Sequence, residues 1–327
     1  DEICFTGSGT EATNAALKGA FFYQKQKKFH LITSPVEHEA TLESAHFLES
    51  LGARIHYIPV DFQGQISLAA VEHKLKELAN DNNNFIMLSM MAANNETGVI
   101  FPYQELGVLC KNHGAAFHLD AVQAPGKLEN FSITSSHADF VSLSAHKIGG
   151  PKGMGALYIH RGQKLVPLLH GGAQERKRRA GTMNVASIAA FAKAAEQLAK
   201  RDLRAVKNLR THLESMLRER IRGIHLQGEG SMRLVNTANF LFDGVRGESL
   251  LMGLDIAGFA VSSGSACNSG SVNPSHVLLA MGHDKAAAAS AIRISLSPDN
   301  TQAEIDSFVE ALVPLVARIR ERSSRLS

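Results

Sequence analysis

Polar side chains that could do chemistry follow several short apolar runs of this sequence, each where a strand is expected to end. Ser8, Gly9 and Thr10 follow the first run, and His38 follows the second. Later runs are followed by Asn95, Asp120, Gln123, Ser144, His146 and Lys147. Ligands of open α/β sheets bind at the carboxyl ends of the strands. We therefore expect a hydroxyl, an imidazole, an amide, a carboxylate and an amine to meet in one crevice.

The elements that must position these side chains alternate along the first part of the chain. Several of the expected strands are apolar on both faces, as strands buried in a parallel sheet must be. They cover residues 3–6, 30–33, 54–59, 85–91, 115–119, 139–143 and 156–159. Helical periods separate them, and Gly52 and Gly114 stand where C-terminal caps are expected. This alternation predicts an α/β fold, with a mainly parallel sheet covered by helices on both faces.

The pattern changes near residue 200, where we place a domain boundary. From Ser187 onward, apolar residues recur every three or four positions in long helical periods. Strand-like pieces follow at 234–242 and 260–263, and Thr301 and Glu304 form the capping box of a final helix. The sequence thus predicts a large domain over residues 1–200 and a smaller α+β domain over residues 201–327.

Composition excludes several classes of protein. The 327 residues are 44% hydrophobic and 20% charged, which is typical of globular proteins and not of disordered ones. The 34 basic and 31 acidic residues give a net charge of +3, too weak to indicate a nucleic-acid partner. No apolar run approaches the roughly 18 residues that a membrane helix needs. The 15 histidines are scattered without metal-ligand spacing, so we expect no metal site.

The three cysteines, Cys4, Cys110 and Cys267, lack the spacing of a disulfide framework. This indicates a reducing compartment, and we expect a soluble, cytoplasmic enzyme. Cys4 and Cys110 lie in apolar surroundings and are expected to be small buried hydrophobes. Cys267 stands among glycines, serines and an asparagine, a composition typical of a solvent-facing loop whose thiol can act as a nucleophile.

The glycine turn at residues 7–12, Gly-Ser-Gly-Thr-Glu-Ala, opens a helix. Helix N-termini offer N–H groups and a positive dipole, which suit a phosphate, and Ser144 and His146 could complete such a site. The turn matches neither the nucleotide P-loop nor the dinucleotide fingerprint. An ordinary helix cap is the alternative.

Lys147 follows a buried strand and precedes a glycine-proline turn, which would hold it close to the sheet edge. A lysine held there can form a Schiff base, with Lys152 as the second candidate. A solvated surface charge is the ordinary alternative. Asp120 suits the pyridinium nitrogen of pyridoxal phosphate, although it could instead cap a helix.

Six motifs in register carry a resemblance to a known family. They are Thr-Gly-Ser-Gly-Thr-Glu-Ala-Thr-Asn at 6–14, Glu-His-Glu at 37–39, Asn-Asn-Glu-Thr-Gly at 94–98, His-Leu-Asp-Ala-Val-Gln at 118–123, Ser-Ala-His-Lys-Ile-Gly-Gly-Pro-Lys-Gly at 144–153 and Ser-Ser-Gly-Ser-Ala-Cys at 262–267. Together they resemble the cysteine desulfurases of the nitrogen-fixation and housekeeping iron–sulfur type. These belong to the class-V aminotransferases, pyridoxal-phosphate enzymes of fold type I. The resemblance covers essentially the whole chain.

The resemblance implies a role for each site residue. Lys147 would bind the cofactor covalently, His38 would stack on its ring and shuttle protons, and Asp120 would pair with the ring nitrogen. The remaining cofactor contacts would come from Gly9, Thr10, Asn95, Gln123, Ser144, His146 and, from the neighbouring subunit of a homodimer, Thr182. Gln123 would bond the phenolic oxygen, and Asn95 and Arg293 would grip the substrate carboxylate.

The implied reaction converts L-cysteine into L-alanine. Cys267, on a mobile loop over about residues 262–273, would take the sulfur as a persulfide. It would pass the sulfur to a protein acceptor, such as an iron–sulfur scaffold or a sulfur carrier, for iron–sulfur cluster or thio-cofactor biosynthesis.

Two departures from the family pattern bear on this interpretation. Relatives carry several dozen residues before the position of Asp1, so we expect that an N-terminal segment of the large domain is missing. Where relatives carry glycines and a small turn, this chain has Ala173, Lys177, Arg178 and Ala180. The alternatives are a selenocysteine lyase or an aminotransferase on the same fold, or a catalytically incomplete sulfur-transfer partner or scaffold.

Overall fold

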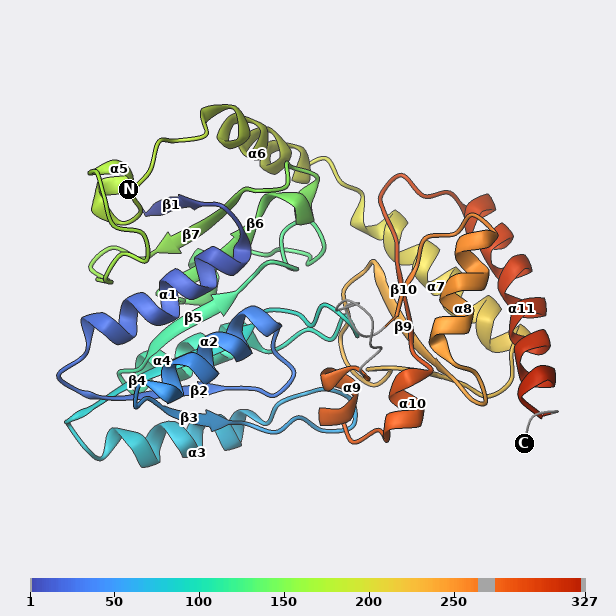
Figure 1. Cartoon of the computed structure of the whole chain (residues 1–327), viewed down its shortest axis with the longest axis horizontal. Coiled ribbons are helices and arrows are strands. Elements are labelled where there is room, and N and C mark those ends of the chain that lie inside the picture. Colours follow the sequence, from blue (N-terminus) through green and yellow to red (C-terminus); the bar gives the residue numbers. More distant parts are fainter. Residues whose placement is uncertain (1, 264–273, 325–327) are drawn as a thin grey trace. The chain divides into compact units, whose positions relative to one another are not determined.

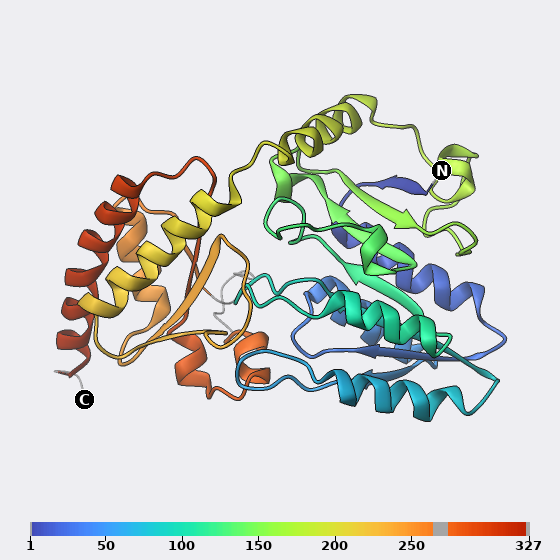
Figure 2. The same cartoon turned by 180° about the vertical axis from the view of Figure 1, so that it is seen from behind.

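The computed structural model describes residues 2–263 and 274–324, and the chain divides into two compact units (Figures 1 and 2). The first unit takes the chain up to Pro59, then Ile66–Asn94 and Phe101–Arg201. The second takes Val60–Gln65, Asn95–Ile100 and the chain from Asp202 onward. Two short segments of the first 200 residues thus belong to the second unit, which the sequence pattern did not indicate.

The first unit is built on a seven-stranded sheet in the order β1-β7-β6-β5-β4-β2-β3. The strands are β1 (Ile3–Thr6), β2 (Lys28–Thr33), β3 (Arg54–Tyr57), β4 (Asn84–Met91), β5 (Ala116–Asp120), β6 (Phe140–Ser144) and β7 (Gly155–Ile159). Only β7 runs against its neighbours, β1 and β6, and the remaining pairs are parallel. The carboxyl ends of β1, β2, β4, β5 and β6 therefore lie at the same edge of the sheet.

Helices cover both faces of this sheet, which confirms the predicted α/β fold class. Figure 1 shows α1 and α2 on the face toward the viewer, and Figure 2 shows α4 on the opposite face. The helices of this unit are α1 (Gly9–Tyr23), α2 (Glu39–Ser50), α3 (Leu68–Ala79), α4 (Tyr103–Asn112), α5 (Gln174–Lys177) and α6 (Val185–Leu198), with the 3-10 turns η1 (Thr134–Ser136) and η2 (Ala145–Ile148). Gly52 and Gly114 adopt the left-handed conformation, with φ of 96° and 65°, just past α2 and α4, as the sequence predicted.

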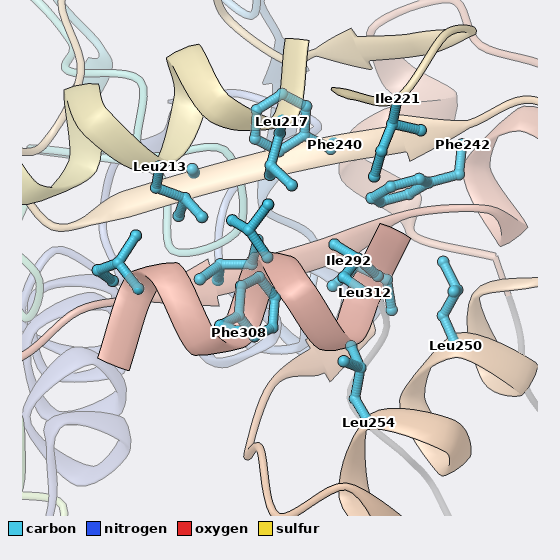
Figure 3. Packing of buried hydrophobic residues seen from close by; sticks show 14 of the residues in the cluster. Leu213, Leu217, Ile221, Phe240, Phe242, Leu250, Leu254, Ile292, Phe308 and Leu312 are labelled. Carbon is cyan, nitrogen blue, oxygen red and sulfur yellow. The ribbon is translucent and has the colours of Figure 1, made fainter. Parts of the chain in front are cut away.

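The second unit is an α+β structure on an antiparallel sheet in the order β10-β11-β9-β8. Its elements are α7 (Leu203–Arg220), β8 (Ile224–Leu226), β9 (Thr237–Phe242), α8 (Gly247–Ile256), β10 (Ser262–Ser263), α9 (His276–Ala280), α10 (Lys285–Ala289), β11 (Ile292–Ser295) and α11 (Gln302–Ser324). The sequence predicted β9 three residues too long and did not predict β8 or β11. Figure 3 shows the core of this unit, in which Leu217 of α7 and Leu312 of α11 pack with Phe240 of β9.

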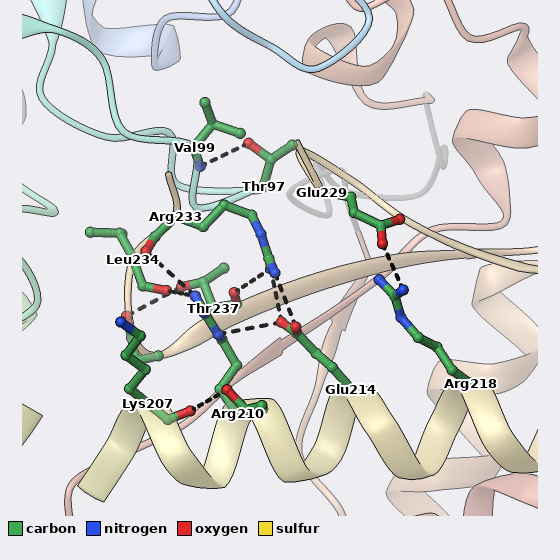
Figure 4. A network of polar contacts seen from close by, with 12 residues as sticks. Thr97, Val99, Lys207, Arg210, Glu214, Arg218, Glu229, Arg233, Leu234 and Thr237 are labelled. Carbon is green, nitrogen blue, oxygen red and sulfur yellow. Dashed lines mark hydrogen bonds and ion pairs between the residues drawn. The ribbon is translucent and has the colours of Figure 1, made fainter. Parts of the chain in front are cut away.

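The inserted segment Asn95–Ile100 is fastened to the second unit by backbone and charge contacts (Figure 4). Leu234 N donates to the carbonyl oxygen of Gly98 at 2.8 Å, and Val99 pairs with Arg233 in an isolated bridge. Arg233 in turn forms an ion pair with Glu214 of α7 at 2.9 Å, and Arg210 of α7 donates to the carbonyl of Leu234. A helix that lies more than 100 residues later in the chain therefore fixes the segment that begins with Asn95.

Within the described ranges 2–263 and 274–324, no helix combines the length and the apolar character needed to cross a membrane.

Candidate active site

The N-terminus of α1 follows β1 directly and is closed by a reciprocal cap. Ser8 Oγ accepts a hydrogen bond from Glu11 N at 3.0 Å, and Glu11 Oε2 accepts one from Gly7 N at 2.7 Å. This is a variant of the capping box, in which Glu11 accepts from the residue before the N-cap, and it fixes the first turn of the helix. The first N–H groups of a helix have no partner within it, and together with the helix dipole they form a site for an anion.

Two glycines let this helix end approach the strands of the sheet closely. A Cβ on Gly9 would lie 2.8 Å from Cγ2 of Val122 and 3.4 Å from Cβ of Ser144. A Cβ on Gly155 would lie 2.4 Å from the carbonyl carbon of Ser8. Any larger side chain at either position would push the helix away. The anion site of α1 consequently lies beside Ser144 at the end of β6 and beside the turn that follows β5.

Basic side chains gather at the same corner. Ser144 Oγ lies 2.9 Å from Nδ1 of His146. Partial burial, and then the positive charges of Lys147, Lys152 and Lys127, lower the pKa of His146. His146 thus lies beside Ser144 in the positive field of three lysines, an environment that favours a phosphate.

Lys147 lies on η2, the tight turn that follows β6. Ala145 N donates to the carbonyl of Met154 at 3.0 Å, and Gly150 N donates to the carbonyl of Ala145 at 2.8 Å, so both ends of the turn are fixed. Ala145 and Ile148 are buried, whereas Lys147 between them is exposed. The turn therefore presents the side chain of Lys147 at the carboxyl edge of the sheet.

Asp120 is the last residue of β5 and is only 7% exposed. Burial raises the pKa of its carboxyl, while the hydrogen bond from Val122 N, 2.9 Å from Oδ1, lowers it. No helix follows Asp120 directly, since residues 121–124 form turns and the next described helix is η1, so the alternative role of helix cap does not apply. A buried carboxylate of this kind stabilises a protonated ring nitrogen.

His38 is the N-cap of α2, and its ring has one defined orientation. Nδ1 accepts a hydrogen bond from Ala40 N at 3.0 Å. An accepting Nδ1 carries no hydrogen, so the hydrogen of the neutral ring lies on Nε2. His38 therefore has one ring nitrogen committed to the helix cap and the other available for proton transfer.

Three further predicted cofactor residues belong to the first unit. Thr10 is exposed in the first turn of α1, and Gln123 accepts a hydrogen bond from Nζ of Lys127 at 2.5 Å. Thr182 is exposed and lies two residues before the N-cap of α6.

Asn95 and Arg293 lie together in the second unit. Nη1 of Arg293 donates to the carbonyl oxygen of Asn95 at 2.9 Å, although 198 positions separate them in the sequence. Burial lowers the pKa of Arg293, and the charge of Glu96 opposes this. Nε of Arg293 is buried and has no hydrogen-bond partner among the residues that the structure describes. A buried guanidinium with a donor to spare is suited to a carboxylate ligand.

Sequence patterns missed several side chains that support these groups. Glu37 is fully buried beside His38, Arg201 contacts the turn of Lys147, and Arg179 forms an ion pair with Glu11 at 2.9 Å. Of these residues, Glu37 alone had a signal in the sequence, because it belongs to the Glu-His-Glu motif at 37–39. The predicted nucleophile Cys267 lies outside the described residues.

The residues at the sheet edge fit pyridoxal phosphate. The N-terminus of α1, which is suited to an anion, lies beside Ser144, and a buried carboxylate can face a ring nitrogen. A lysine amine for a covalent bond and an imidazole for the ring face complete the set of groups that this cofactor requires.

Comparisons with known proteins agree with this fit. The aminotransferase class-V family pattern matches residues 1–308. The cysteine desulfurase 2 of Trichormus variabilis is 45% identical over 321 residues, which cover 98% of this chain and 79% of that protein. A solved NifS-like protein superimposes with a TM-score of 0.85 at 37% identity, covering 99% of this chain and 82% of that one. The structure described as SspA in complex with cysteine gives 0.77 at 34% identity, covering 91% and 82%. With a lysine, a buried carboxylate and an anion site at one sheet edge, this chain belongs to the class-V aminotransferase family and, within it, to the cysteine desulfurases, which use pyridoxal phosphate.

Proposed function

We propose that this protein converts L-cysteine into L-alanine with pyridoxal phosphate and takes the sulfur as a persulfide on Cys267. The observation that carries the proposal is the meeting of Lys147, Asp120 and the N-terminus of α1 at one edge of the sheet. The relative solved with cysteine, at 34% identity, supports cysteine as the substrate.

The anion site of α1 would hold the cofactor phosphate, through Gly9 and Thr10 together with Ser144 and His146. Asp120 would face the ring nitrogen, and Lys147 would form the covalent bond. Gln123 would contact the phenolic oxygen, and its present donor, Lys127, can move aside because both side chains are only partly buried. When bound, pyridoxal phosphate supplies an electron sink for the charge that develops at the substrate α-carbon.

Two side chains of this chain would move protons. The amine of Lys147, once released from the cofactor by the substrate, would take the α-proton as a general base. His38 would hold or deliver a proton at Nε2, because Nδ1 is engaged by Ala40 N. The two roles need different atoms, and the structure provides one on η2 and one on the N-cap of α2.

Arg293 and Asn95 would bind the carboxylate of the substrate. The spare Nε donor of Arg293 supports this role, since its desolvated guanidinium gains most from an anionic ligand. Cys267 Sγ would attack the sulfur of cysteine, so that an S–S bond forms while the C–S bond of the substrate breaks. The electron pair of that bond stays with the carbon, which takes up a proton and leaves as alanine, and the persulfide retains the second sulfur.

The active protein would be a cytoplasmic homodimer that delivers its sulfur to a protein acceptor. The two described cysteines, Cys4 and Cys110, are free thiols, which supports a reducing compartment. Val185 at the start of α6 is 71% exposed, and the alanines at 186, 189, 190, 192 and 195 are exposed along the same helix. An apolar helix surface of this kind supports contact with a second copy, which Thr182 would reach through its phosphate-binding hydroxyl.

The test uses the purified protein with pyridoxal phosphate, L-cysteine and a reductant, and measures sulfide and alanine together. Equal amounts of both are expected from the wild type. Lys147→Ala should lose the Schiff-base chromophore, whereas the control Lys152→Ala should keep it. Cys267→Ser should keep the chromophore but lose sulfide release.

Other outcomes would replace the proposal by a defined alternative. Undiminished turnover by Cys267→Ser would remove the persulfide role and favour a selenocysteine lyase or an aminotransferase. A large preference for selenocysteine would indicate a selenocysteine lyase. Failure to bind the cofactor would indicate that the protein is a catalytically incomplete scaffold or sulfur-transfer partner.

A further inference from the structure

Arg201 contacts the turn that carries Lys147. Its Nη2 donates a hydrogen bond of 2.7 Å to the carbonyl oxygen of Ile148, the residue that follows Lys147 and ends η2. Arg201 lies 53 positions later in the sequence, just past α6, and is partly buried. A hydrogen bond from a charged donor is stronger than one between neutral groups, so this contact restrains the end of the turn.

Glycines in two neighbouring turns leave room for the guanidinium of Arg201. A Cβ on Gly126 would lie 2.8 Å from Nη1 of Arg201, and one on Gly149 would lie 3.5 Å from Nη2. Both glycines have positive φ, 70° and 86°, which other residues rarely adopt. Gly149 is the C-cap of η2, and Gly126 follows Gln123 by three residues. Arg201 therefore contacts the lysine turn and lies beside the turn of Gly126, which directly follows the turn that carries Gln123, another proposed cofactor residue.

Helix α6 completes this support. Phe191 packs with Ala145, Ile148 and Met154 in one buried cluster, and Leu198 packs against it. The apolar side of η2 thus rests on α6, and the polar carbonyl of Ile148 is met by Arg201, which follows that helix. The side chain of Lys147 is therefore the exposed part of a turn that α6 and Arg201 hold on its buried side.

We propose that Arg201 is a positioning residue for Lys147, holding η2 so that the lysine amine meets the aldehyde carbon of pyridoxal phosphate. The inference rests on the proposed function, because it takes Lys147 as the residue that binds the cofactor. A reacting group held in place gains a high effective concentration, and a displacement of about 1 Å can cost roughly 100-fold in rate. Arg201 should therefore affect covalent attachment and turnover more than it affects cofactor binding.

The test compares Arg201→Met with the matched control Lys200→Met, which removes a charge from the neighbouring exposed position. Binding is measured with pyridoxine 5′-phosphate, which lacks the aldehyde and reports only the anion and ring contacts. Covalent attachment is measured from the growth of the Schiff-base chromophore with pyridoxal phosphate. Arg201→Met should bind pyridoxine phosphate within twofold of the wild type but attach pyridoxal phosphate roughly 10- to 100-fold more slowly. The control should match the wild type in both.

A second measurement needs no cofactor. Amide hydrogen exchange of the cofactor-free protein reports the turn through Gly150 N, which donates to Ala145, and reports β7 as an internal reference. Arg201→Met should speed exchange at Gly150 at least threefold and leave Gly155–Ile159 unchanged. Arg201→Lys, which keeps the charge and one donor, should show a smaller effect in the same direction.

Two results would overturn the proposal. Equal losses of pyridoxine phosphate binding and of covalent attachment would show a general structural role, and unchanged exchange at Gly150 with unchanged attachment would show no role. The proposed function fails separately, when the wild type itself produces no alanine from cysteine. The exchange result on Gly150 stands in that case, because it requires neither substrate nor cofactor.

Discussion

His118 is a fully buried histidine in the middle of β5, where it joins three strands and a helix. Its Nδ1 lies 2.8 Å from Ser89 Oγ of β4, and its Nε2 lies 2.8 Å from Ser142 Oγ of β6. Thr13 of α1 donates to the same Ser142 oxygen at 3.1 Å. Asp120 and Ser144 each lie two residues farther along the same strands, so this network fixes the strands that carry two site residues.

Burial lowers the pKa of His118 to about 3. The unfolded chain takes up a proton near pH 6.5 and the folded protein does not, so stability falls as pH drops from 6.5 toward 3. At pH 5 this loss amounts to about 2 kcal/mol. We expect His118→Gln to be less stable at pH 7 but to lose less between pH 7 and pH 5 than the wild type does.

Urea unfolding of the first unit, followed without cofactor at both pH values, measures this difference. The exposed His46→Gln is the control and should keep the wild-type pH dependence. The same pH dependence in His118→Gln and the wild type would contradict the prediction.

Glu37 is a second buried titratable group, with the opposite pH dependence. Its Oε1 accepts hydrogen bonds from Ser34 Oγ at 2.9 Å and from Met91 N at 3.1 Å, so it joins the ends of β2 and β4 just before His38. Burial, assisted by the charge of Asp120, raises the pKa of Glu37 to about 8, against the opposing bond from Met91. The folded protein therefore keeps this carboxyl protonated at neutral pH.

Glu37→Gln should flatten the stability profile between about pH 4.5 and pH 8. The folded pKa lies above the unfolded value near 4.5, so the wild type loses stability as pH rises from about 4.5 to 8, by about 3 kcal/mol from pH 5 to pH 8. Glutamine keeps the accepting oxygen and cannot ionise, so the variant should be at least as stable as the wild type at pH 8.5. Chemical unfolding of the cofactor-free protein checks this, with the exposed Glu49→Gln as control. An equal or steeper loss of stability between pH 5 and pH 8 in Glu37→Gln would refute it.

At the scale of elements, the segment around α5 has a strained backbone. Glu175, Arg176 and Lys177 are consecutive residues with φ of 44°, 57° and 63°, the left-handed region that favours glycine. Lys177 and Ala173 both belong to the stretch where the resemblance leads us to expect glycines and a small turn, but Lys177 is left-handed, whereas Ala173 has an ordinary φ of −82°. The two substitutions therefore differ in their cost to this chain.

Lys177→Gly should stabilise the protein, and Ala173→Gly should destabilise it. The left-handed conformation costs a non-glycine residue about 1–2 kcal/mol. Glycine also lowers the folding stability by about 0.5–1 kcal/mol, because its unfolded chain has more conformational entropy to lose. We expect a net gain of about 0.5–1 kcal/mol for Lys177→Gly and a loss of similar size for Ala173→Gly. Thermal unfolding of the two variants side by side measures both, and equal shifts of the same sign would rule out backbone strain as the cause.

At the scale of the whole molecule, each unit has its own apolar core. The second unit buries Phe240, which is 0% exposed, among side chains of α7, α8 and α11, and the first unit buries Phe117 of β5 equally completely. Proteins with two such cores commonly unfold in more than one step. The proposed Schiff base on Lys147 would make its chromophore a reporter of the first unit.

Phe240→Ala should lower the unfolding midpoint of the second unit alone. Removing a buried phenylalanine side chain typically costs about 3–5 kcal/mol. In a urea titration, helix loss from the second unit should then precede loss of the chromophore, while the matched variant Phe117→Ala should shift the chromophore loss itself. A single coincident transition in both variants would show that the two units unfold as one.

The sequence by itself determined the fold class and the family, because both depend on local patterns: apolar runs, helical periods, and motifs whose residues are close along the chain. It also placed Lys147, Asp120 and His38 at or just after the carboxyl ends of strands, and the structure places Asp120 as the last residue of β5. The domain boundary, the roles of the site residues and the part played by Cys267 remain predictions.

Only the tertiary structure decided which residues support those groups. The reversed direction of β7 has no signature in its own composition, and neither does the assignment of Asn95 to the second unit beside Arg293. The burial of Glu37 and His118 and the contact of Arg201 with Ile148 depend on neighbours that are distant along the chain. Burial and contact arise from packing in space, and such pairs leave no periodic pattern in the sequence.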